Sequence, residues 1–213
     1  MIISWYGQSC FRIEGKGGSI LIDRFSKDIG LREPKIKDNI LLVTHDHYDH
    51  GNVKDAPDDV TIISGPGEYD IGEVYIGGIL SYHDNSKGSE RGLNTIYIIR
   101  TEGINICHMG DFGQSVLEDD QLDEIGEIDI LMIPVGGKYT IDAKQAVDVI
   151  RKIEPKIIIP MHYKIAGLNL DIDGPEKFIK EIGLKPENVE KFRVTQKTLP
   201  QEEMQLVVFG GEQ

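Results

Sequence analysis

Cysteine is scarce in this chain of 213 residues, where only Cys10 and Cys107 occur and neither belongs to a CxxC pair. This scarcity excludes a framework of disulfide bonds and a zinc site closed by paired thiolates. We therefore expect both cysteines to be reduced, partly buried thiols, which is the usual state in the cytoplasm.

Long apolar runs are missing as well. No run approaches the roughly 18 consecutive apolar residues that a membrane-spanning helix needs. Residues 1–6 carry neither the basic segment nor the long apolar segment of a signal peptide. We therefore predict a cytoplasmic location without membrane contact.

Basic residues are in the minority. The chain has 23 Lys and Arg against 36 Asp and Glu, which gives a formal net charge of −13. Proteins bind nucleic acids and anionic membranes through clustered Lys and Arg, so this balance argues against both partners. We expect a small-molecule substrate and no nucleic acid, and homo-oligomer formation is left open.

Glycine and proline, at 24 and 9 residues, are too few to indicate a low-complexity chain. A unit of this length buries roughly 70–75% of its unfolded surface, so neither a disulfide nor a structural metal is needed for folding. Since no stretch resembles a linker, we predict a single domain over residues 1–213.

Short β-rich runs separated by glycine turns occupy the first half of the chain. Residues 2–6, 10–13 and 19–23 predict an antiparallel meander. Residues 39–44 are almost all apolar, which is typical of a strand buried on both faces. The remaining predictions for this half are strands at 60–64 and 74–82, a hairpin of strands at 94–100 and 104–108, and a turn at 65–69.

Strands alternate with helices in the second half. Buried strands are predicted at 129–134 and 156–160, and between them the apolar residues of 142–153 recur at helical spacing. Asp142 and Gln145 form a capping box at the start of that helix. A further helix is predicted from Pro175 to Gly183, and a last strand at 203–209. The alternation predicts an α/β fold with a large mixed sheet system.

Histidine is concentrated directly after the buried strand 39–44. His45, His47 and His50 lie within six residues, together with Asp49. Residues i and i+2 of an extended segment point to the same side, so His45 and His47 can converge on one cation. After the chain turns, Asp49 and His50 can face a second cation. Imidazole and carboxylate donors suit Zn²⁺, Mn²⁺ or Fe²⁺ rather than Ca²⁺.

The His-x-His-x-Asp-His motif after a buried strand resembles the signature of the metallo-β-lactamase superfamily. His83, Asp111 and His162 follow in the order of the remaining ligand motifs of that family. The resemblance spans nearly the whole chain and implies an α/β (α+β) fold, a four-layer αββα sandwich with metals at one edge between the sheets. Residues 110–113, 134–137 and 160–163 resemble the branch that includes the ascorbate-6-phosphate lactonase.

This resemblance also implies a ligand set and an activity. The implied ligands are His45, His47 and His83 for a first metal ion, Asp49, His50 and His162 for a second, and Asp111 as the bridge. The implied cofactors are two divalent ions, with Zn expected and Mn or Fe as alternatives. Two such ions lower the pKa of a shared water toward about 7, and the hydroxide attacks a small ester, lactone or phosphorylated metabolite. Asp49 is the expected catalytic residue, because it can orient the nucleophile and pass a proton to the leaving group.

Arg91 and Tyr163 are the expected substrate contacts. Arg91 can bind a phosphate or carboxylate through two hydrogen bonds, although a solvated hairpin charge would have the same sequence context. Tyr163 follows the last ligand and either donates a hydrogen bond to an oxyanion or packs. His108 is expected to support a ligand or the core. Glu68 is a candidate supporting carboxylate.

Other activities stay open for the same ligand set. One is a metal-dependent nuclease or phosphodiesterase, against which the acidic charge counts. Another is a di-iron redox protein, and a third is a binding protein without catalysis. The fold alone does not choose among them.

Overall fold

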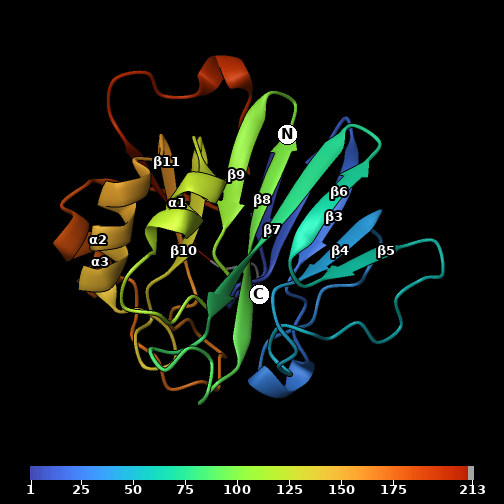
Figure 1. The fold of residues 1–213 in the computed structure, drawn as a ribbon, viewed down its shortest axis with the longest axis horizontal. Coiled ribbons are helices and arrows are strands. Elements are labelled where there is room, and N and C mark those ends of the chain that lie inside the picture. The colour runs from blue at the N-terminus through green and yellow to red at the C-terminus, as the bar shows by residue number, and fades with distance from the viewer. Residues whose placement is uncertain (211–213) are drawn as a thin grey trace.

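Strands outnumber helices in residues 1–210, the part of the chain that the computed structural model describes (Figure 1). In chain order the elements are β1 (Ile2–Trp5), β2 (Phe11–Gly15), β3 (Gly18–Ile22), the short 3-10 helix η1 (Lys27–Ile29), β4 (Ile40–Val43), β5 (Thr61–Ser64), β6 (Gly67–Ile71), β7 (Val74–Tyr82), β8 (Leu93–Thr101), β9 (Ile104–His108), α1 (Asp119–Ile125), β10 (Ile130–Pro134), α2 (Ala143–Ile153), β11 (Ile157–Met161), α3 (Glu176–Ile182), β12 (Pro186–Val189), β13 (Lys191–Arg193), the 3-10 helix η2 (Gln196–Thr198) and β14 (Gln205–Phe209).

The strands form two mixed sheets. Sheet A has six strands in the order β13-β1-β2-β3-β4-β5, and sheet B has eight in the order β12-β14-β11-β10-β9-β8-β7-β6. The predicted meander β1-β2-β3 and the predicted hairpin β8-β9 are both antiparallel, as expected. Parallel pairing joins β4 to β3 and β5, and β10 to β9 and β11. Strands β4, β10 and β11 are buried at every position, which explains why their sequences are continuously apolar.

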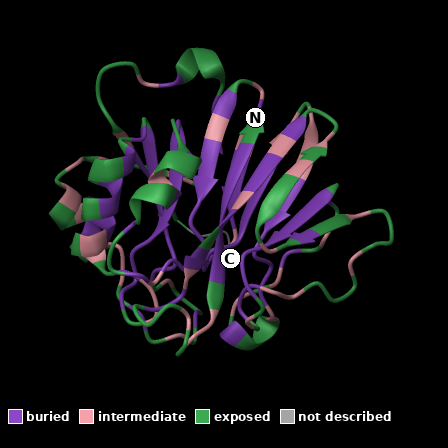
Figure 2. Cartoon of the chain, viewed as in Figure 1, coloured by how far each residue is buried: buried purple, intermediate pink, exposed green. Residues whose placement is uncertain are grey.

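The layers follow from the alternation of side chains along the strands. Ile20 and Ile22 of β3 face the core between the sheets, whereas Leu21 joins Leu41 and Phe25 in a second apolar cluster on the outer face of sheet A. Helices α1, α2 and α3 lie on the sheet B side (Figure 1), and the central strands are buried between the layers (Figure 2). The predicted α/β sandwich of two mixed sheets is confirmed. The layer over sheet A consists of η1 and loops, and the α helices lie over sheet B.

The best-defined helix is the one that the sequence predicts between two buried strands. Helix α2 begins after Asp142, whose carboxylate accepts a hydrogen bond from the Gln145 main-chain N–H at 2.9 Å. In return the Gln145 side chain accepts one from the Asp142 N–H at 3.0 Å, which completes the predicted capping box. Ala146 and Ile150 are fully buried on its inner face. Helix α3 ends at Gly183, which adopts a left-handed φ of 70° as predicted.

Several elements differ from the sequence prediction. Residues 65–69 were expected to form a turn, but β6 already begins at Gly67 and pairs with β7, so only Gly65 and Pro66 make the turn. The glycine and proline residues of this segment indicate a turn, and their presence masks the pattern of the short edge strand. Helix α1 is not predicted, because its seven residues are mostly acidic and only Gln121 and Ile125 are buried. The edge strands β12 and β13 are missed because they are short and largely polar, with Phe192 of β13 as the buried residue.

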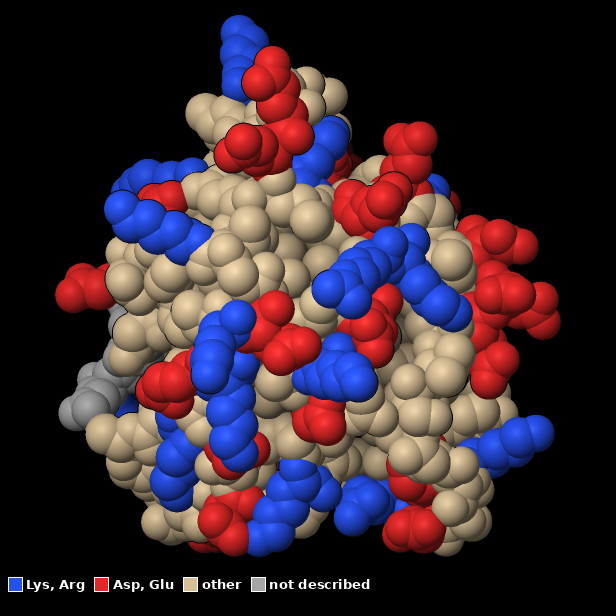
Figure 3. Space-filling model, turned by 90° about the vertical axis from the view of Figure 1, so that its left-hand side faces the viewer, with Lys and Arg blue, Asp and Glu red and all other residues tan. Residues whose placement is uncertain are grey.

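Charges of both signs cover the helical side of the molecule. Figure 3 shows Lys and Arg interspersed with Asp and Glu on this face, where Arg151 pairs with Asp148 at 3.2 Å and Lys177 with Asp173 at 2.7 Å. Such exposed pairs contribute little to stability. Every helix within residues 1–210 is too short or too polar to span a bilayer.

One edge of the sandwich collects the loops that carry the predicted site. These loops follow β4, β7, β9 and β11, and they lie at the lower edge in Figure 1. Strands of both sheets end there, so residues far apart in the sequence meet in one place.

Candidate metal centre

The seven predicted ligands come from four loops and gather at this edge. His45, His47, Asp49 and His50 follow β4, His83 follows β7, Asp111 follows β9 and His162 follows β11. Their donor atoms form two groups, one of His45, His47 and His83 and one of Asp49, His50, Asp111 and His162. Within each group the donor atoms all lie within 4.8 Å of one another. The structure therefore brings together every residue of the predicted ligand set.

Asp111 lies between the two groups. Its Oδ2 is 3.2 Å from His83 Nε2 and 3.2 Å from His162 Nε2. Its Oδ1 is 3.2 Å from His50 Nε2. One carboxylate thus faces imidazoles from both groups.

The donor atoms lack other partners. Nε2 of His45, His50 and His162 is buried without a hydrogen-bond partner among residues 1–210. Buried polar atoms are nearly always satisfied in folded proteins, so these nitrogens indicate a ligand. Imidazole nitrogens with carboxylate oxygens match a divalent transition metal. The residues present therefore fit the metal that the sequence implies.

The carboxylates of the cluster favour a positive charge at its centre. Burial alone disfavours a charged His50, but the carboxylates of Asp111, Asp49 and Asp23 raise its pKa well above the usual value. Burial, and then the charge of His50, lowers the pKa of His45 to about 3. Burial opposes ionisation of Asp111, yet the facing His162 and His50 hold the pKa of Asp111 well below its usual value. A bound cation would take the place of the proton on His50.

Asp23 supports this centre, and the sequence analysis did not identify it. Its carboxylate is fully buried and accepts hydrogen bonds from the main-chain N–H and the hydroxyl of Thr44, both at 2.8 Å. It also lies 3.0 Å from Nδ1 of His50. This contact places the His50 proton on Nδ1 and leaves Nε2 for a metal. Because β3 runs parallel to β4, the acid that follows β3 lies beside the histidine loop, and this pairing is apparent only in the folded chain.

Two further contacts hold the carboxylate ligands. Gln8 donates from Nε2 to Asp49 Oδ2 at 2.9 Å, and Ser9 donates from Oγ to Asp111 Oδ1 at 3.3 Å. His108 lies behind Ser9, with Nε2 at 2.9 Å from the Ser9 carbonyl oxygen and Nδ1 accepting from the Gly110 N–H. Both nitrogens of His108 are therefore occupied, so this residue positions the loops and does not bind a metal.

A cavity of about 320 Å³ opens over the cluster. It is lined by ligands from both groups, namely His47, His83, Asp49, Asp111 and His162, and by Tyr48, Arg91, Tyr139 and Leu170. Its volume lies at the small end of the usual range for ligand pockets, about 300–1,000 Å³. The opening gives a small molecule access to the centre.

Arg91 reaches this opening on a loop that Asp84 organises. The buried Asp84 carboxylate accepts main-chain N–H bonds from Ser86, Gly88, Glu90 and Arg91 at 2.7, 2.9, 3.0 and 2.8 Å. These bonds hold the pKa of Asp84 below its usual value against the opposing effect of desolvation. The guanidinium of Arg91 lies 6.0 Å from the ring centre of Tyr139. The predicted substrate contact therefore borders the centre.

Tyr163 and Glu68 do not face the opening. Tyr163 is buried, donates from its hydroxyl to the Phe209 carbonyl at 2.8 Å and packs 4.7 Å from the Trp5 ring. This geometry favours packing over the predicted substrate contact. Glu68 is exposed on β6 and accepts a hydrogen bond from Tyr75, so it supports no ligand.

Neither cysteine belongs to the donor groups. Cys10 and Cys107 are unpaired and fully buried, more deeply than predicted. Burial raises the pKa of both thiols, so they stay protonated and unreactive.

Comparisons with known proteins agree with this geometry. The model of a family described as beta-lactamase superfamily domain matches residues 2–162. A UPF0173 protein of Pyrococcus furiosus is 30% identical over 85% of this chain and 90% of its own length. A UPF0173 metal-dependent hydrolase of Thermoplasma volcanium is 31% identical over 76% of this chain and 82% of its own. A crystal structure from Thermotoga maritima, assigned to the metallo-beta-lactamase superfamily as a Zn-dependent hydrolase, is 32% identical, covers 98% of both chains and superposes with a TM-score of 0.77.

Proposed function

This chain belongs to the metallo-beta-lactamase superfamily and is a metal-dependent hydrolase, and from that premise we propose that it hydrolyses a small ester, lactone or phosphorylated metabolite at a pair of divalent cations. The observation that carries the proposal is the position of Asp111 between two donor groups. A site for a single ion would use only one of the two donor groups. The lactonase-like branch suggested by the sequence motifs stays a prediction.

Zinc is the cation we propose. Five imidazoles and two carboxylates form the donor set, and nitrogen-rich sites of this kind favour zinc among the common divalent ions. Manganese and iron fit the same donors and are the alternatives. When bound, such a pair supplies a nucleophile at neutral pH by lowering the pKa of water from 15.7 to about 7.

Asp49 is the proposed catalytic residue. It lines the opening, and its Oδ2 accepts a hydrogen bond from Gln8 at 2.9 Å and lies 3.5 Å from His50 Nε2. Burial opposes its ionisation, but His50 lowers the pKa of Asp49, so the carboxylate is ionised. We assign it the orientation of the attacking water and the transfer of a proton to the leaving oxygen.

Arg91 is the proposed anchor for an anionic group on the substrate. It is the arginine that lines the opening, and its guanidinium makes a long ion pair with Glu90 at 4.0 Å. Guanidinium groups bind phosphate and carboxylate through paired hydrogen bonds. A small substrate is supported by the size of the opening.

An activity screen tests this proposal. Zinc-, manganese- and iron-loaded protein is assayed on aryl esters, lactones, phosphomonoesters and phosphodiesters, next to the chelated protein. We expect metal-dependent hydrolysis of at least one ester or lactone and a loss of about 100-fold or more in kcat for Asp49→Asn. Asp58→Asn, an exposed acid in the following loop, is the control that should keep full activity.

Other outcomes of the screen decide against the proposal. Undiminished turnover by Asp49→Asn would show that Asp49 takes no part in the reaction. Cleavage restricted to phosphodiesters would establish the phosphodiesterase alternative. An iron-loaded protein with a visible chromophore and no hydrolysis would establish the redox alternative.

A further inference from the structure

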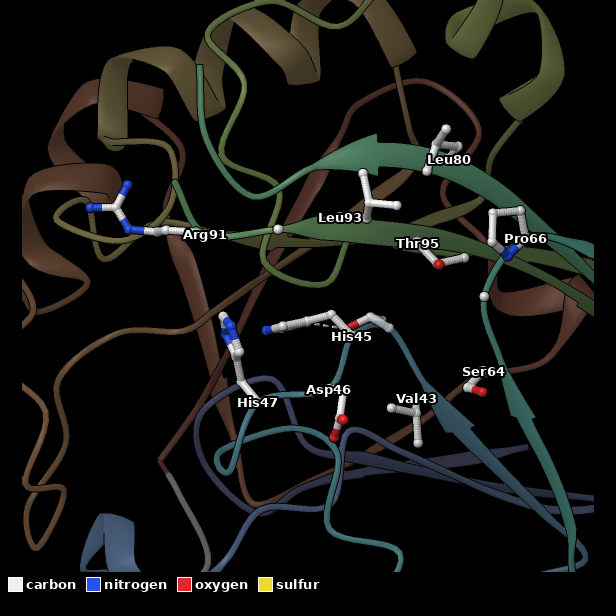
Figure 4. A pocket seen from close by; sticks show the side chains of 13 residues that line it. Val43, His45, Asp46, His47, Ser64, Pro66, Leu80, Arg91, Leu93 and Thr95 are labelled. Carbon is white, nitrogen blue, oxygen red and sulfur yellow. Dashed lines mark hydrogen bonds between the residues drawn. The ribbon is translucent and has the colours of Figure 1, made fainter. Parts of the chain in front are cut away.

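A second cavity continues from the metal centre. It measures about 450 Å³ and shares His47 and Arg91 with the opening described above (Figure 4). His45 also lines it, so the cavity begins at the first donor group. We call it the side groove.

Apolar side chains from both sheets form the walls of the side groove. On sheet B, Leu80 lies opposite Thr95, and Leu93 is two residues before Thr95 on β8, so the three side chains share one face. Val43 of β4 lines the groove from sheet A, and Pro66, in the turn between β5 and β6, lines one end of it. The groove therefore lies in the gap between the sheets at their open edge.

Leu80 and Leu93 are unusually exposed for large apolar residues beside a catalytic centre. Their exposed fractions are 42% and 56%. Both line the groove and lie on the strands above His45 in Figure 4. Adjacent exposed apolar side chains mark surfaces that bind apolar groups, whereas isolated ones do not.

The polar groups of the side groove are already engaged or lie at its ends. At its floor the main-chain N–H of Thr95 donates a hydrogen bond to the Thr44 carbonyl oxygen at 2.9 Å. The Thr44 hydroxyl donates to Asp23. Asp46 is exposed at the rim, and the guanidinium of Arg91 points away from Leu80 and Leu93 (Figure 4). The interior thus suits an uncharged, apolar chain.

We propose that the side groove binds the apolar acyl arm of the substrate, so that the enzyme acts on esters or lactones of medium-length acyl groups. This inference rests on the proposed function. The groove begins at two metal ligands, so a chain attached directly to the reacting carbonyl carbon enters it, and the leaving group faces the opening beside Arg91. In the reaction the water oxygen forms a bond to the carbonyl carbon, the bond from that carbon to the leaving oxygen breaks, and a proton passes to the leaving oxygen.

Two measurements on zinc-loaded protein test the inference. The first is kcat/KM for p-nitrophenyl acetate, butanoate, hexanoate and octanoate. The second is the dissociation constant of acetate and of octanoate, measured by titration calorimetry. For the wild type we expect kcat/KM and affinity to rise about twofold to fourfold for each of the first added methylenes, because the arm leaves water.

Variants show whether the side groove causes this dependence. In the double variant Leu80→Thr with Leu93→Thr, the octanoate-to-acetate ratio should fall about tenfold or more below the wild-type ratio. Threonine retains strand propensity at these exposed positions, so the fold should persist. Ile62→Thr is the matched control, since Ile62 is 45% exposed on β5 and does not line the groove, and its ratio should equal that of the wild type.

The outcomes separate this inference from the proposed function. Hydrolysis that is independent of acyl length, or a double variant that keeps the wild-type ratio, overturns the groove assignment and leaves the hydrolase intact. A second outcome is that no ester is hydrolysed, but octanoate binds more tightly than acetate and does so only when Leu80 and Leu93 are present. In that case the ester substrate is wrong and the groove assignment stands. Absence of both effects overturns both.

Discussion

Asp111 faces imidazoles of both donor groups, and two of the ligands beside it, His50 and Asp49, are held by residues outside the donor groups. Asp23 orients His50, and Gln8 holds Asp49. Such supports keep a ligand in one tautomer and one orientation before the metal arrives. At the scale of single residues, the centre is therefore pre-organised.

Replacement of Asp23 tests this support. Asp23→Asn keeps the size of the side chain and removes the charge that faces His50, so divalent metal affinity should fall about 10- to 100-fold. Competition with a chromophoric chelator measures the change, and Asp58→Asn is the exposed control. Equal affinities in the two variants would show that His50 needs no carboxylate partner.

The raised pKa of His50 predicts that metal binding is coupled to proton release. In the metal-free protein the imidazole is protonated at neutral pH, and a divalent ion requires it neutral. The apparent metal affinity should therefore rise about tenfold per pH unit until the raised pKa is reached. The same proton stabilises the metal-free fold below the unfolded pKa of about 6.5, and this contribution is lost as the pH rises through the folded pKa.

Calorimetric titration with zinc in buffers of different ionisation enthalpy measures the released proton. We expect release of about one proton at pH 7 from this imidazole. A heat of binding that is independent of the buffer would contradict the coupling.

At the scale of loops and strands, glycines let the segments after β9 and β10 pass close to ligand residues. A Cβ added at Gly113 would lie 2.2 Å from the carbonyl oxygen of His83. A Cβ added at Gly136 would lie 2.1 Å from that of His162. Both contacts are with main chain, so the ligand segments themselves would have to move.

Gly136→Ala should therefore disturb both the fold and the centre. We expect a loss of about 1–3 kcal/mol in the free energy of unfolding and weaker metal binding, because His162 is displaced. Denaturant unfolding and chelator competition measure the two effects. Gly210→Ala, where a Cβ meets no atom within 4 Å, is the control. An unchanged unfolding midpoint for Gly136→Ala would contradict the tight fit.

The sequence predicts an element well where its pattern is long or its chemistry specific. Strand β4 is a continuous apolar run, and α2 combines helical spacing with a capping box, so both are found. Helix α1 and strand β6 are not found, because one is mostly acidic and the other is a polar edge strand beside a Gly-Pro-Gly turn. Such elements are fixed by neighbours in the fold and carry little local signal.

At the scale of the whole molecule, the topology assembles a centre from residues 45 to 162 at one edge of two sheets. The sequence identifies the ligands because histidine and aspartate motifs are rare and ordered. It does not identify Asp23 or Gln8, since their roles depend on which strand end lies beside which. The side groove is likewise invisible in the sequence, because Leu80 and Leu93 meet Val43 and Pro66 only when the sheets pack.

The number of cations bound per chain tests the central claim most directly. Protein loaded with zinc and freed of excess metal is analysed by mass spectrometry of the elements, together with an Asp111→Ala variant. The proposed function predicts two zinc ions per wild-type chain and fewer in the variant, since Asp111 faces both donor groups. A wild-type chain that retains fewer than two divalent ions, or an Asp111→Ala chain that retains two, would contradict the claim.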